Sequence, residues 1–349
     1  MEILITGGAG FFGLHMAKRL SKSIKGCRIL LLDVIDSNKK EYPSGCRFIR
    51  GDVRDKKLMM KITKHTNIII HAAAALPLRS REEILEVNIN GTRNLLEAAV
   101  RNKIRQFVYI SSTAVYGVPK VHPIDEKAAL VGVGPYGESK IYAEKLCGKY
   151  RKKGLTVTVI RPKTFVGTHR LGVFEILFDW IKDGKKIPVI GDGTNRYQLL
   201  DVDDLTEAIY LIISAKNKAK VNGIFNIGAE KYDTVGKDLQ TVFDYARSGS
   251  EIMPTPAFLV KKALWFFEKM KLSPLYQWVY DTADKDSYVS VNKLMKTLKW
   301  HPRYSNSQAL IKSYRWYLNN YDEIKSRPAG TTHTVGWKQG ILGLFKKFF

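Results

Sequence analysis

The sequence has few cysteines and histidines, and they are not grouped as metal ligands are. It contains three cysteines, Cys27, Cys46 and Cys147, and seven histidines scattered along 349 residues. The cysteines are far apart and match no zinc or redox spacing. We therefore predict free thiols in a reducing compartment and no metal site.

Long apolar runs and flexible linkers are also missing. No run of about 18 apolar residues occurs, which argues against a transmembrane helix. No Pro/Gly/Ser-rich linker divides the chain. The first residues, MEILITGGAG, already indicate a strand and a glycine turn, which leaves no room for a signal peptide. We therefore expect a cytoplasmic protein.

Acidic residues are few beside the basic ones. The chain has 57 Lys and Arg against 33 Asp and Glu, a formal net charge of +24. Such a charge attracts polyanions, but the lysines are dispersed and no known nucleic-acid-binding pattern is present. We predict a generally basic surface and no nucleic-acid partner. An anionic membrane surface is the specific partner that fits best.

What the sequence does contain is a regular alternation of segments over residues 1–165. This alternation predicts a parallel sheet covered by helices. We predict an α/β fold with a Rossmann-type doubly wound parallel sheet at 1–165, to which some later segments return. A smaller α/β substrate lobe is predicted at 166–325 and a basic amphipathic tail at 326–349. Strand-like runs lie at 2–6, 27–34, 46–53, 67–74, 106–117 and 155–162, and helical patterns at 13–23, 84–103 and 136–153.

A glycine-rich stretch, TGGAGFFG, runs from Thr6 to Gly13 between the first strand and the first helix. Gly7, Gly10 and Gly13 allow a tight turn, close approach to a pyrophosphate and close helix packing, with the helix N-terminus facing the phosphates. Asp33 ends the second strand, 20 residues after Gly13 (33 − 13). A carboxylate there accepts hydrogen bonds from a ribose 2′-hydroxyl and repels a 2′-phosphate, so the pattern favours NAD over NADP.

Together with later motifs, this stretch resembles the extended short-chain dehydrogenases/reductases of the NAD-dependent sugar-nucleotide epimerase/dehydratase family, UDP-glucose 4-epimerase-like. The resemblance covers roughly residues 1–320. Its further motifs are GDVRD (51–55), HAAA (71–74), VNINGTRNLLEAA (87–99), SSTAVYG (111–117), YGESK (136–140), RPKTFVG (161–167), GDGTNRYQLLDVDDLTEAI (191–209), FNIG (225–228) and LKWHPRYS (298–305).

The resemblance implies a set of cofactor contacts and a homodimer formed by two helices of each chain. Asp52 and Val53 match positions that hold adenine, and Asn88 matches a buried asparagine of the family. In VDDLTEAI we expect a helix start capped by Asp203 or Asp204. The implied contacts to NAD are Gly7, Gly10, Phe11, Phe12, Gly13, Asp33, Asp52, Val53, Ala72, Ala73, Ala74, Asn88, Tyr136, Lys140 and Pro162.

The implied catalytic residues are Ser112, Tyr136 and Lys140. A phenol titrates near pH 10, too high for an efficient base at neutral pH. The ammonium of Lys140 and the positive nicotinamide of bound NAD favour the phenolate and lower its pKa. The phenolate can then accept a proton from a sugar hydroxyl, while the Ser112 hydroxyl, rather than that of Ser111, shares the same oxygen.

The residues after Ser112 discriminate among reactions. Sugar-nucleotide 4,6-dehydratases carry an Asp-Glu pair there, and this chain has Thr113 and Ala114. Elimination is therefore disfavoured, and 4-epimerisation of a nucleotide-linked hexose is favoured. An NAD-dependent dehydrogenase or reductase of an apolar alcohol, steroid- or isoprenoid-type, stays open. So does a non-catalytic protein that binds NAD.

The predicted substrate contacts are Ser112, Thr113, Thr164 and Arg196, and here the chain departs from its relatives. Thr164 stands where many have Asn, and Tyr197 where an arginine is common. Arg196 either replaces that arginine or is a surface charge. A late arginine that often clamps the diphosphate is missing from residues 280–293.

Two amphipathic stretches, 258–280 and 335–349, point to an apolar partner. The second has aromatic and aliphatic residues at helical spacing beside lysines, as an interfacial helix for an anionic membrane does. It fits equally a terminal helix docked on the protein or in a dimer interface. With a membrane contact, peripheral at the inner face, a lipid-diphosphate-linked sugar becomes a sensible substrate.

Overall fold

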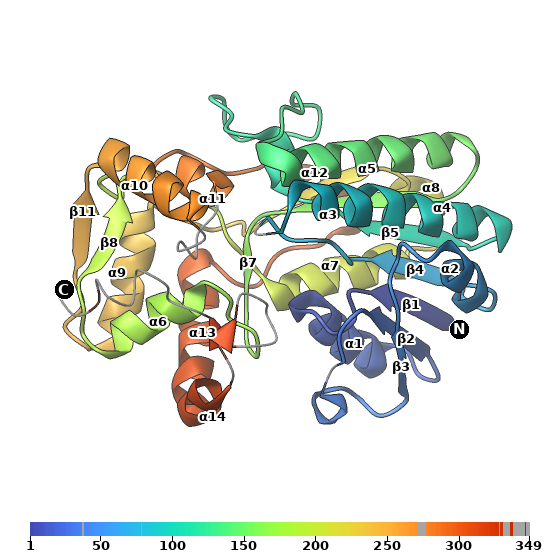
Figure 1. Cartoon of the computed structure of the whole chain (residues 1–349), viewed down its shortest axis with the longest axis horizontal. Coiled ribbons are helices and arrows are strands. Elements are labelled where there is room, and N and C mark those ends of the chain that lie inside the picture. Colours follow the sequence, from blue (N-terminus) through green and yellow to red (C-terminus); the bar gives the residue numbers. More distant parts are fainter. Residues whose placement is uncertain are drawn as a thin grey trace.

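Seven parallel strands form the central sheet of the computed structural model (Figure 1). The structure describes residues 1–36, 38–77, 79–270, 277–327, 329–330, 336–337 and 346. The order across the sheet is β10-β6-β5-β4-β1-β2-β3. The strands are β1 (Glu2–Thr6), β2 (Arg28–Asp33), β3 (Cys46–Arg50), β4 (Ile68–His71), β5 (Gln106–Ile110), β6 (Val157–Pro162) and β10 (Ile224–Ile227).

The apolar residues of the strands point alternately into two separate cores. In β1, Ile3 and Ile5 join the core that contains α1 and α7, whereas Leu4 joins the core that contains α4 and α5. Successive side chains of a strand point to opposite faces, and a parallel sheet covered on both faces needs both to be apolar. The predicted Rossmann-type doubly wound sheet is confirmed, and β10 adds a late segment to its edge beside β6.

Helices cover both faces of the sheet, and a smaller lobe lies to the left in Figure 1. The lobe has its own core around α6, α9 and α13. The helices are α1 (Phe11–Ser23), η1 (Lys39–Glu41), α2 (Lys56–Ile62), α3 (Arg81–Leu85), α4 (Thr92–Arg101), η3 (Thr113–Tyr116), α5 (Gly134–Lys152), α6 (Phe174–Lys182), α7 (Val202–Ser214), α8 (Lys218–Val221), α9 (Val235–Ala246), α10 (Ala257–Lys269), α11 (Gln277–Thr282), α12 (Asn292–Leu298), α13 (Asn306–Asn319) and α14 (Tyr321–Ser326). The short strands are β7 (Phe165–Val166), β8 (Ile187–Ile190), β9 (Leu200–Asp201), β11 (Ile252–Thr255), β12 (Ala329–Gly330) and β13 (Gly336–Trp337).

A π-helical turn, η2 (Glu86–Gly91), interrupts the helix predicted at 84–103. The prediction of one α-helix there is wrong in this respect. A π turn changes the backbone hydrogen-bond partner by one residue and barely alters the apolar spacing that the prediction used. Such turns are frequent at functional sites, and this one carries Asn88.

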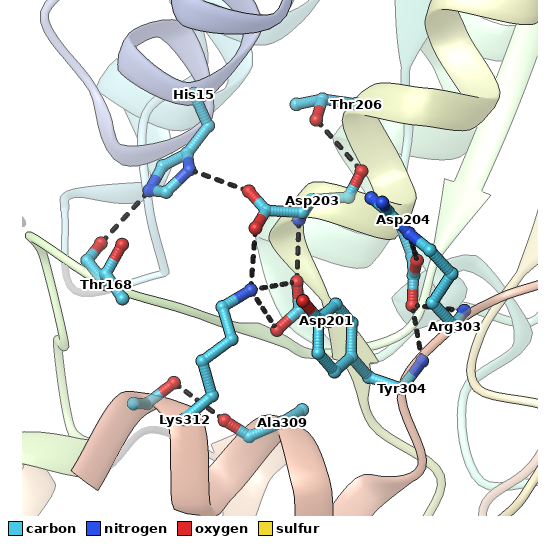
Figure 2. Close-up of polar contacts among 11 residues, drawn as sticks. His15, Thr168, Asp201, Asp203, Asp204, Thr206, Arg303, Tyr304, Ala309 and Lys312 are labelled. Atoms are coloured by element: carbon cyan, nitrogen blue, oxygen red, sulfur yellow. Dashed lines mark hydrogen bonds and ion pairs between the residues drawn. The ribbon is translucent and has the colours of Figure 1, made fainter. Parts of the chain in front are cut away.

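Buried polar contacts tie the start of α7 to α1 and α13 (Figure 2). The Lys312 ammonium on α13 lies 2.7 Å from both Asp201 Oδ1 and Asp203 Oδ2. His15 Nδ1 on α1 lies 3.3 Å from Asp203 Oδ1. Lys312 of the lobe contacts two carboxylates at the start of α7. These contacts hold the lobe against the sheet domain.

The residue that caps α7 is Asp201, so the prediction of Asp203 or Asp204 is wrong. The Asp201 carboxylate accepts a hydrogen bond from the backbone N of Asp203 at 2.8 Å. Asp204 instead accepts from the backbone N of Arg303 at 3.0 Å and of Tyr304 at 3.1 Å (Figure 2). Its carboxylate thus holds a loop of the distant LKWHPRYS segment, a contact that local sequence does not reveal.

Most of the tail predicted to bind a membrane, 335–349, lies outside the described residues. Gly336–Trp337 form a short strand with Ala329–Gly330 and not a helix. The Lys346 ammonium lies 2.6 Å from Asp183 Oδ2 and also contacts Asp179. Within the part of the chain that is described, no helix is long and apolar enough to span a membrane.

Candidate active site

The glycine turn lies at the carboxyl end of β1, against the segment that leaves β4. Gly7 has a φ of +71°, and a Cβ there would lie 2.9 Å from the Ala73 backbone N. A Cβ on Gly13 would lie 2.5 Å from Gly7 O. Only glycine fits at these two positions. The cradle keeps α1 close to β1 and leaves the helix N-terminus directed at the place of a pyrophosphate.

Asp33 ends β2 beside this turn. Its Oδ2 accepts a hydrogen bond from the Ala9 backbone N at 2.9 Å, and its Oδ1 accepts from the Ile35 backbone N at 3.3 Å. Burial raises the pKa of Asp33, and these backbone donors oppose that rise. The carboxylate is therefore fixed to the glycine turn, and its contact with a ribose of NAD stays a prediction.

The remaining predicted cofactor residues lie at strand ends around this turn. The Asp52 carboxylate lies 2.6 Å from the Arg54 guanidinium, which lowers the pKa of Asp52, and Val53 is buried. The Phe11 ring stacks on Phe165 with a centroid distance of 5.4 Å. The Phe12 side chain lies in the core, so Phe11 and Phe12 offer a ligand mainly their backbone. Ala72, Ala73 and Ala74 follow β4, and Pro162 ends β6.

A chain of buried hydrogen bonds runs from the glycine turn to the π turn. His71 Nδ1 lies 2.7 Å from Thr6 Oγ1, and His71 Nε2 lies 2.9 Å from Thr92 Oγ1. Thr92 Oγ1 in turn donates to Asn88 O at 2.7 Å. Burial lowers the pKa of His71 to about 3. His71 is thus a neutral structural link and not a catalytic base.

Asn88 continues this chain to the YGESK turn of α5. Its Oδ1 accepts from the Ala75 backbone N at 2.8 Å, and its Nδ2 donates to Ser139 Oγ at 2.9 Å. Ser139 Oγ donates to Tyr136 O at 2.8 Å. Asn88 therefore positions the first turn of α5 against the strand exit, and its contact with the cofactor stays a prediction.

Two neighbouring serines at the end of β5 have different surroundings. The Ser111 hydroxyl donates to Glu144 Oε1 at 2.6 Å, inside a buried pair of Glu144 with Arg161. The Ser112 hydroxyl accepts from the Ala114 backbone N at 3.1 Å and lies near enough to the Tyr136 phenol to oppose the rise of its pKa. This geometry supports Ser112 as the hydroxyl of the site.

Tyr136 and Lys140 share one face at the start of α5. Lys140 Nζ lies 5.7 Å from the centroid of the Tyr136 ring and donates to Ile110 O at 2.9 Å. Burial raises the pKa of Tyr136 to about 12, and the bond to Ser112 opposes this. Burial lowers the pKa of Lys140 to about 8. The lowered phenol pKa expected from Lys140 is not found in the chain alone, because burial raises this pKa and the Ser112 hydroxyl opposes the rise only in part.

The predicted substrate residues lie on several segments. Thr113 Oγ1 is buried and has no hydrogen-bond partner among the described residues. Thr164 Oγ1 lies 3.3 Å from Tyr197 OH, so the two residues that replace Asn and Arg of relatives contact each other. Arg196 is exposed, with its backbone N bonded to Asp286. Adjacent residues of an extended segment point to opposite sides, and it is Tyr197 that reaches Thr164.

Lys163 is the residue of this region that the sequence reasoning missed. Its side chain is 1% exposed, and Nζ donates to Ser287 Oγ at 2.6 Å. Its position in RPKT, directly after a strand of apolar residues and beside Thr164, could have indicated a site residue. A charged residue is rarely buried at such a position without a purpose or a partner.

Known proteins show the same fold and motif order. The uncharacterized protein y4nG of Sinorhizobium fredii is 33% identical over 343 residues, which are 98% of this chain and 84% of that protein. A putative UDP-glucose 4-epimerase of Methanocaldococcus jannaschii is 27% identical over 336 residues, 91% of this chain and 99% of that one. The structure of a UDP-glucose 4-epimerase from Thermotoga maritima with UDP-glucose covers 92% of this chain and 100% of its own, with a TM-score of 0.77 at 23% identity.

The seven-stranded parallel sheet with a glycine turn after β1 is the fold of the extended short-chain dehydrogenases/reductases. Residues 3–228 match the profile of the NAD dependent epimerase/dehydratase family. The chain belongs to this family, and its cofactor is NAD. The predicted family and cofactor are confirmed, whereas the roles of the single site residues stay predictions.

Proposed function

We propose that this protein is a 4-epimerase of a nucleotide-linked hexose that retains NAD between turnovers. The observation that carries the proposal is the placement of the Ser112 hydroxyl beside the Tyr136 phenol, next to Lys140, in a loop without a carboxylate pair. The names of relatives support it, because the proteins from M. jannaschii and T. maritima are described as UDP-glucose 4-epimerases.

The glycine cradle and Asp33 fit NAD, which when bound supplies the acceptor and later the donor of the C4 hydride. The chain's own residues then handle the proton. Tyr136 accepts the proton of the C4 hydroxyl and later returns it. Ser112 holds the same oxygen by a hydrogen bond. Lys140, one turn further along α5, places its ammonium beside the Tyr136 ring.

Dehydration needs an acid and a base beside the sugar ring, and Thr113 and Ala114 provide neither. A threonine hydroxyl does not ionise near neutral pH and a methyl group carries no acidic proton, so neither serves as a general acid or base. The loop therefore favours a reaction in which only C4 changes. A dehydrogenase or reductase would share Tyr136 but would exchange its cofactor at each turnover.

The proposal is tested by incubating the purified protein with nucleotide-linked hexoses and following the configuration at C4 by NMR. We expect UDP-glucose or its N-acetyl analogue to yield the C4 epimer without added NAD. Turnover that depends stoichiometrically on free NAD would instead favour a dehydrogenase. Absence of any product from these sugars would contradict the proposal.

A homodimer is proposed with it. The helices α4 and α5 pack on one another and carry the exposed apolar residues Val100 and Tyr142. A second copy that packs there would cover both side chains, in agreement with the two-helix interface that the family resemblance implies.

A lipid-diphosphate-linked sugar is a second candidate substrate, favoured by the surface of α10. Four of its apolar residues and Met270 directly after it are exposed, and lysines lie over two of the aromatic rings. Lys269 Nζ is 3.8 Å from the Trp265 ring centroid, and Lys262 Nζ is 4.3 Å from that of Phe258. Such a mixture fits an anionic membrane surface. The exposed residues are Phe258, Leu259, Trp265, Phe266 and Met270.

This surface is connected to the site. Lys261 of α10 pairs with Asp284, directly after α11, and the Thr282 side chain of α11 hydrogen-bonds Tyr197. Figure 1 shows α10 and α11 along one edge of the molecule, toward the start of α5. The surface of α10 is thus linked through α11 to Tyr197, which contacts the predicted substrate residue Thr164.

Sedimentation with vesicles of phosphatidylglycerol and phosphatidylcholine tests this second candidate. We expect the protein to bind, and the double change Trp265→Ser with Phe266→Ser to weaken binding about tenfold or more, because two exposed aromatic groups that would enter the membrane are lost. Tyr245→Ser is the control, since Tyr245 is an exposed aromatic residue on α9. Equal binding by all three proteins would remove the support for a lipid-linked substrate.

A further inference from the structure

Lys163 is a buried cation at the edge of the sheet where ligands bind. It follows β6 directly, and its backbone N donates to Ile227 O at the end of β10 at 2.9 Å. In open α/β sheets, ligands bind outside the carboxyl ends of the strands. The neighbours of Lys163 in sequence, Pro162 and Thr164, are both predicted site residues.

Its ammonium has no anionic partner in the described part of the chain. Nζ donates to Ser287 Oγ at 2.6 Å and lies 4.5 Å from the Tyr197 ring centroid. No carboxylate lies within 4.0 Å of it among the described residues, and burial alone lowers the pKa of Lys163 to about 7. A buried cation with only a hydroxyl and a ring as partners is costly unless an anion joins it.

Two other buried cations of the chain show the usual solution. The Arg161 guanidinium pairs with Glu144, with Nε 2.9 Å from Oε1. The Arg170 guanidinium lies 2.9 Å from Glu41 Oε2. Lys163 differs from both, which indicates that its counter-ion is not part of the protein.

Further unused groups lie around Lys163. His122 Nε2 is buried without a hydrogen-bond partner among the described residues, and the charge of Lys163 acts on the His122 ring. Tyr197, whose ring faces the ammonium, contacts Thr164. Lys163 is thus a buried cation beside both Thr164 and Tyr197.

We propose that Lys163 binds an anionic oxygen group of the substrate, either its diphosphate or a carboxylate on its sugar. The proposal rests on the proposed function, since it takes a nucleotide-linked sugar as the ligand. It adds that the substrate is recognised from the β6 end by an ammonium. The burial of Lys163 is compatible with a role in ligand binding, because Lys140 of the same site is also only 2% exposed.

The test measures binding and not turnover, so its outcome can be distinguished from that of the epimerisation assay. Affinities of UDP, UDP-glucose and UDP-glucuronic acid are determined by calorimetry for the wild type, Lys163→Met and Lys293→Met. Lys293 is the matched control, because it is an exposed lysine 4.9 Å from the Phe225 ring centroid that donates to a backbone carbonyl.

We expect Lys163→Met to weaken binding about 10- to 100-fold, the effect of losing a charged hydrogen bond. A loss for all three ligands identifies the diphosphate as the anion, and a loss for UDP-glucuronic acid alone identifies the sugar carboxylate. Affinities of Lys163→Met within twofold of the wild type, or a wild type that binds none of the three, would overturn the proposal.

Proton uptake provides a readout that a purely structural lysine would not change. With a pKa of about 7, most Lys163 side chains are neutral near pH 8. Binding of an anion should then draw a proton onto Nζ, and the titratable groups that face it are His122 and Tyr197. Calorimetry in buffers of different ionisation enthalpy should show uptake in the wild type and Lys293→Met, but not in Lys163→Met.

Folding of the variant is checked by thermal unfolding. Lys163→Met should be at least as stable as the wild type near pH 7, because it removes a buried charge without a carboxylate partner. If this variant does not fold, Lys163→Gln repeats the binding measurement with an uncharged donor. Unchanged affinity and unchanged proton uptake in Lys163→Gln would equally overturn the proposal.

Discussion

The change Tyr136→Phe is expected to lower kcat about a thousandfold, within the range found when a positioned acid or base is removed. The ring stays in place, because its packing does not depend on the hydroxyl, whereas the group that accepts the C4 proton is lost. NAD should remain bound, since the glycine turn and Asp33 are untouched. Turnover is measured at saturating substrate. The amount of cofactor that stays bound is measured by its fluorescence.

The pH dependence distinguishes this role from a structural one. Burial holds the pKa of Tyr136 at about 12 in the chain alone, so the free protein carries a neutral phenol at pH 7. A positive nicotinamide close to the ring favours the phenolate and lowers this pKa. Because the reactive form is the phenolate, kcat/KM should rise with pH up to the lowered pKa, and Tyr136→Phe should lack this limb.

The control is Tyr142→Phe, which removes the hydroxyl of an exposed tyrosine on the same helix. Its kcat and pH profile should match the wild type. If Tyr136→Phe also turned over at the wild-type rate, Tyr136 would not be the proton acceptor, and the assignment of the whole site would fail.

The second large effect is expected from Asp33→Asn, in the choice between NAD and NADP. The amide keeps the shape of the carboxylate but loses its charge. The affinity for NAD should fall about 10- to 100-fold, because a hydrogen bond to a charged group is lost. The affinity for NADP should rise or stay constant, since the charge that repels a 2′-phosphate is gone.

Dissociation constants for both cofactors are compared on protein from which bound NAD has been removed. Asp36→Asn is the matched control, because Asp36 is exposed and lies three residues further along the chain. Its preference for NAD should equal that of the wild type. An Asp33→Asn protein with an unchanged ratio of the two affinities would show that Asp33 does not select the cofactor.

The sheet and the cofactor side were predictable because their signals are local. Strands such as β1 alternate between two apolar faces, and a parallel sheet imposes that pattern on every covered strand. The glycine turn requires Gly7 and Gly13 at fixed places, since a Cβ at either would collide with backbone. YGESK is helical, so the spacing of Tyr136 and Lys140 alone puts them on one face.

The parts that were not predictable depend on contacts between distant segments. Asp201 caps α7, and its carboxylate is also held by Lys312, which lies 111 residues later. The π turn at Asn88 is stabilised by partners 13 and 51 residues away. Neither pattern is visible in apolar spacing.

The pKa of Tyr136 and the surroundings of Lys163 also depend on contacts between distant segments and could not be predicted. Burial, which raises the first pKa and lowers the second, is a property of the folded chain and not of YGESK or RPKT. The partner of Lys163 is Ser287, 124 residues later. The sequence thus defined the chemistry of the cofactor side better than the surroundings of the substrate.

The central claim is that Tyr136 removes a proton while hydride leaves and returns to the same C4 carbon. The direct measurement uses UDP-hexose with deuterium at C4 in ordinary water, with the product analysed by NMR. We expect the C4 epimer to carry deuterium at C4, with no loss to solvent or to added NAD. An epimer that carries hydrogen at C4, or deuterium found in free NADH, would contradict the claim.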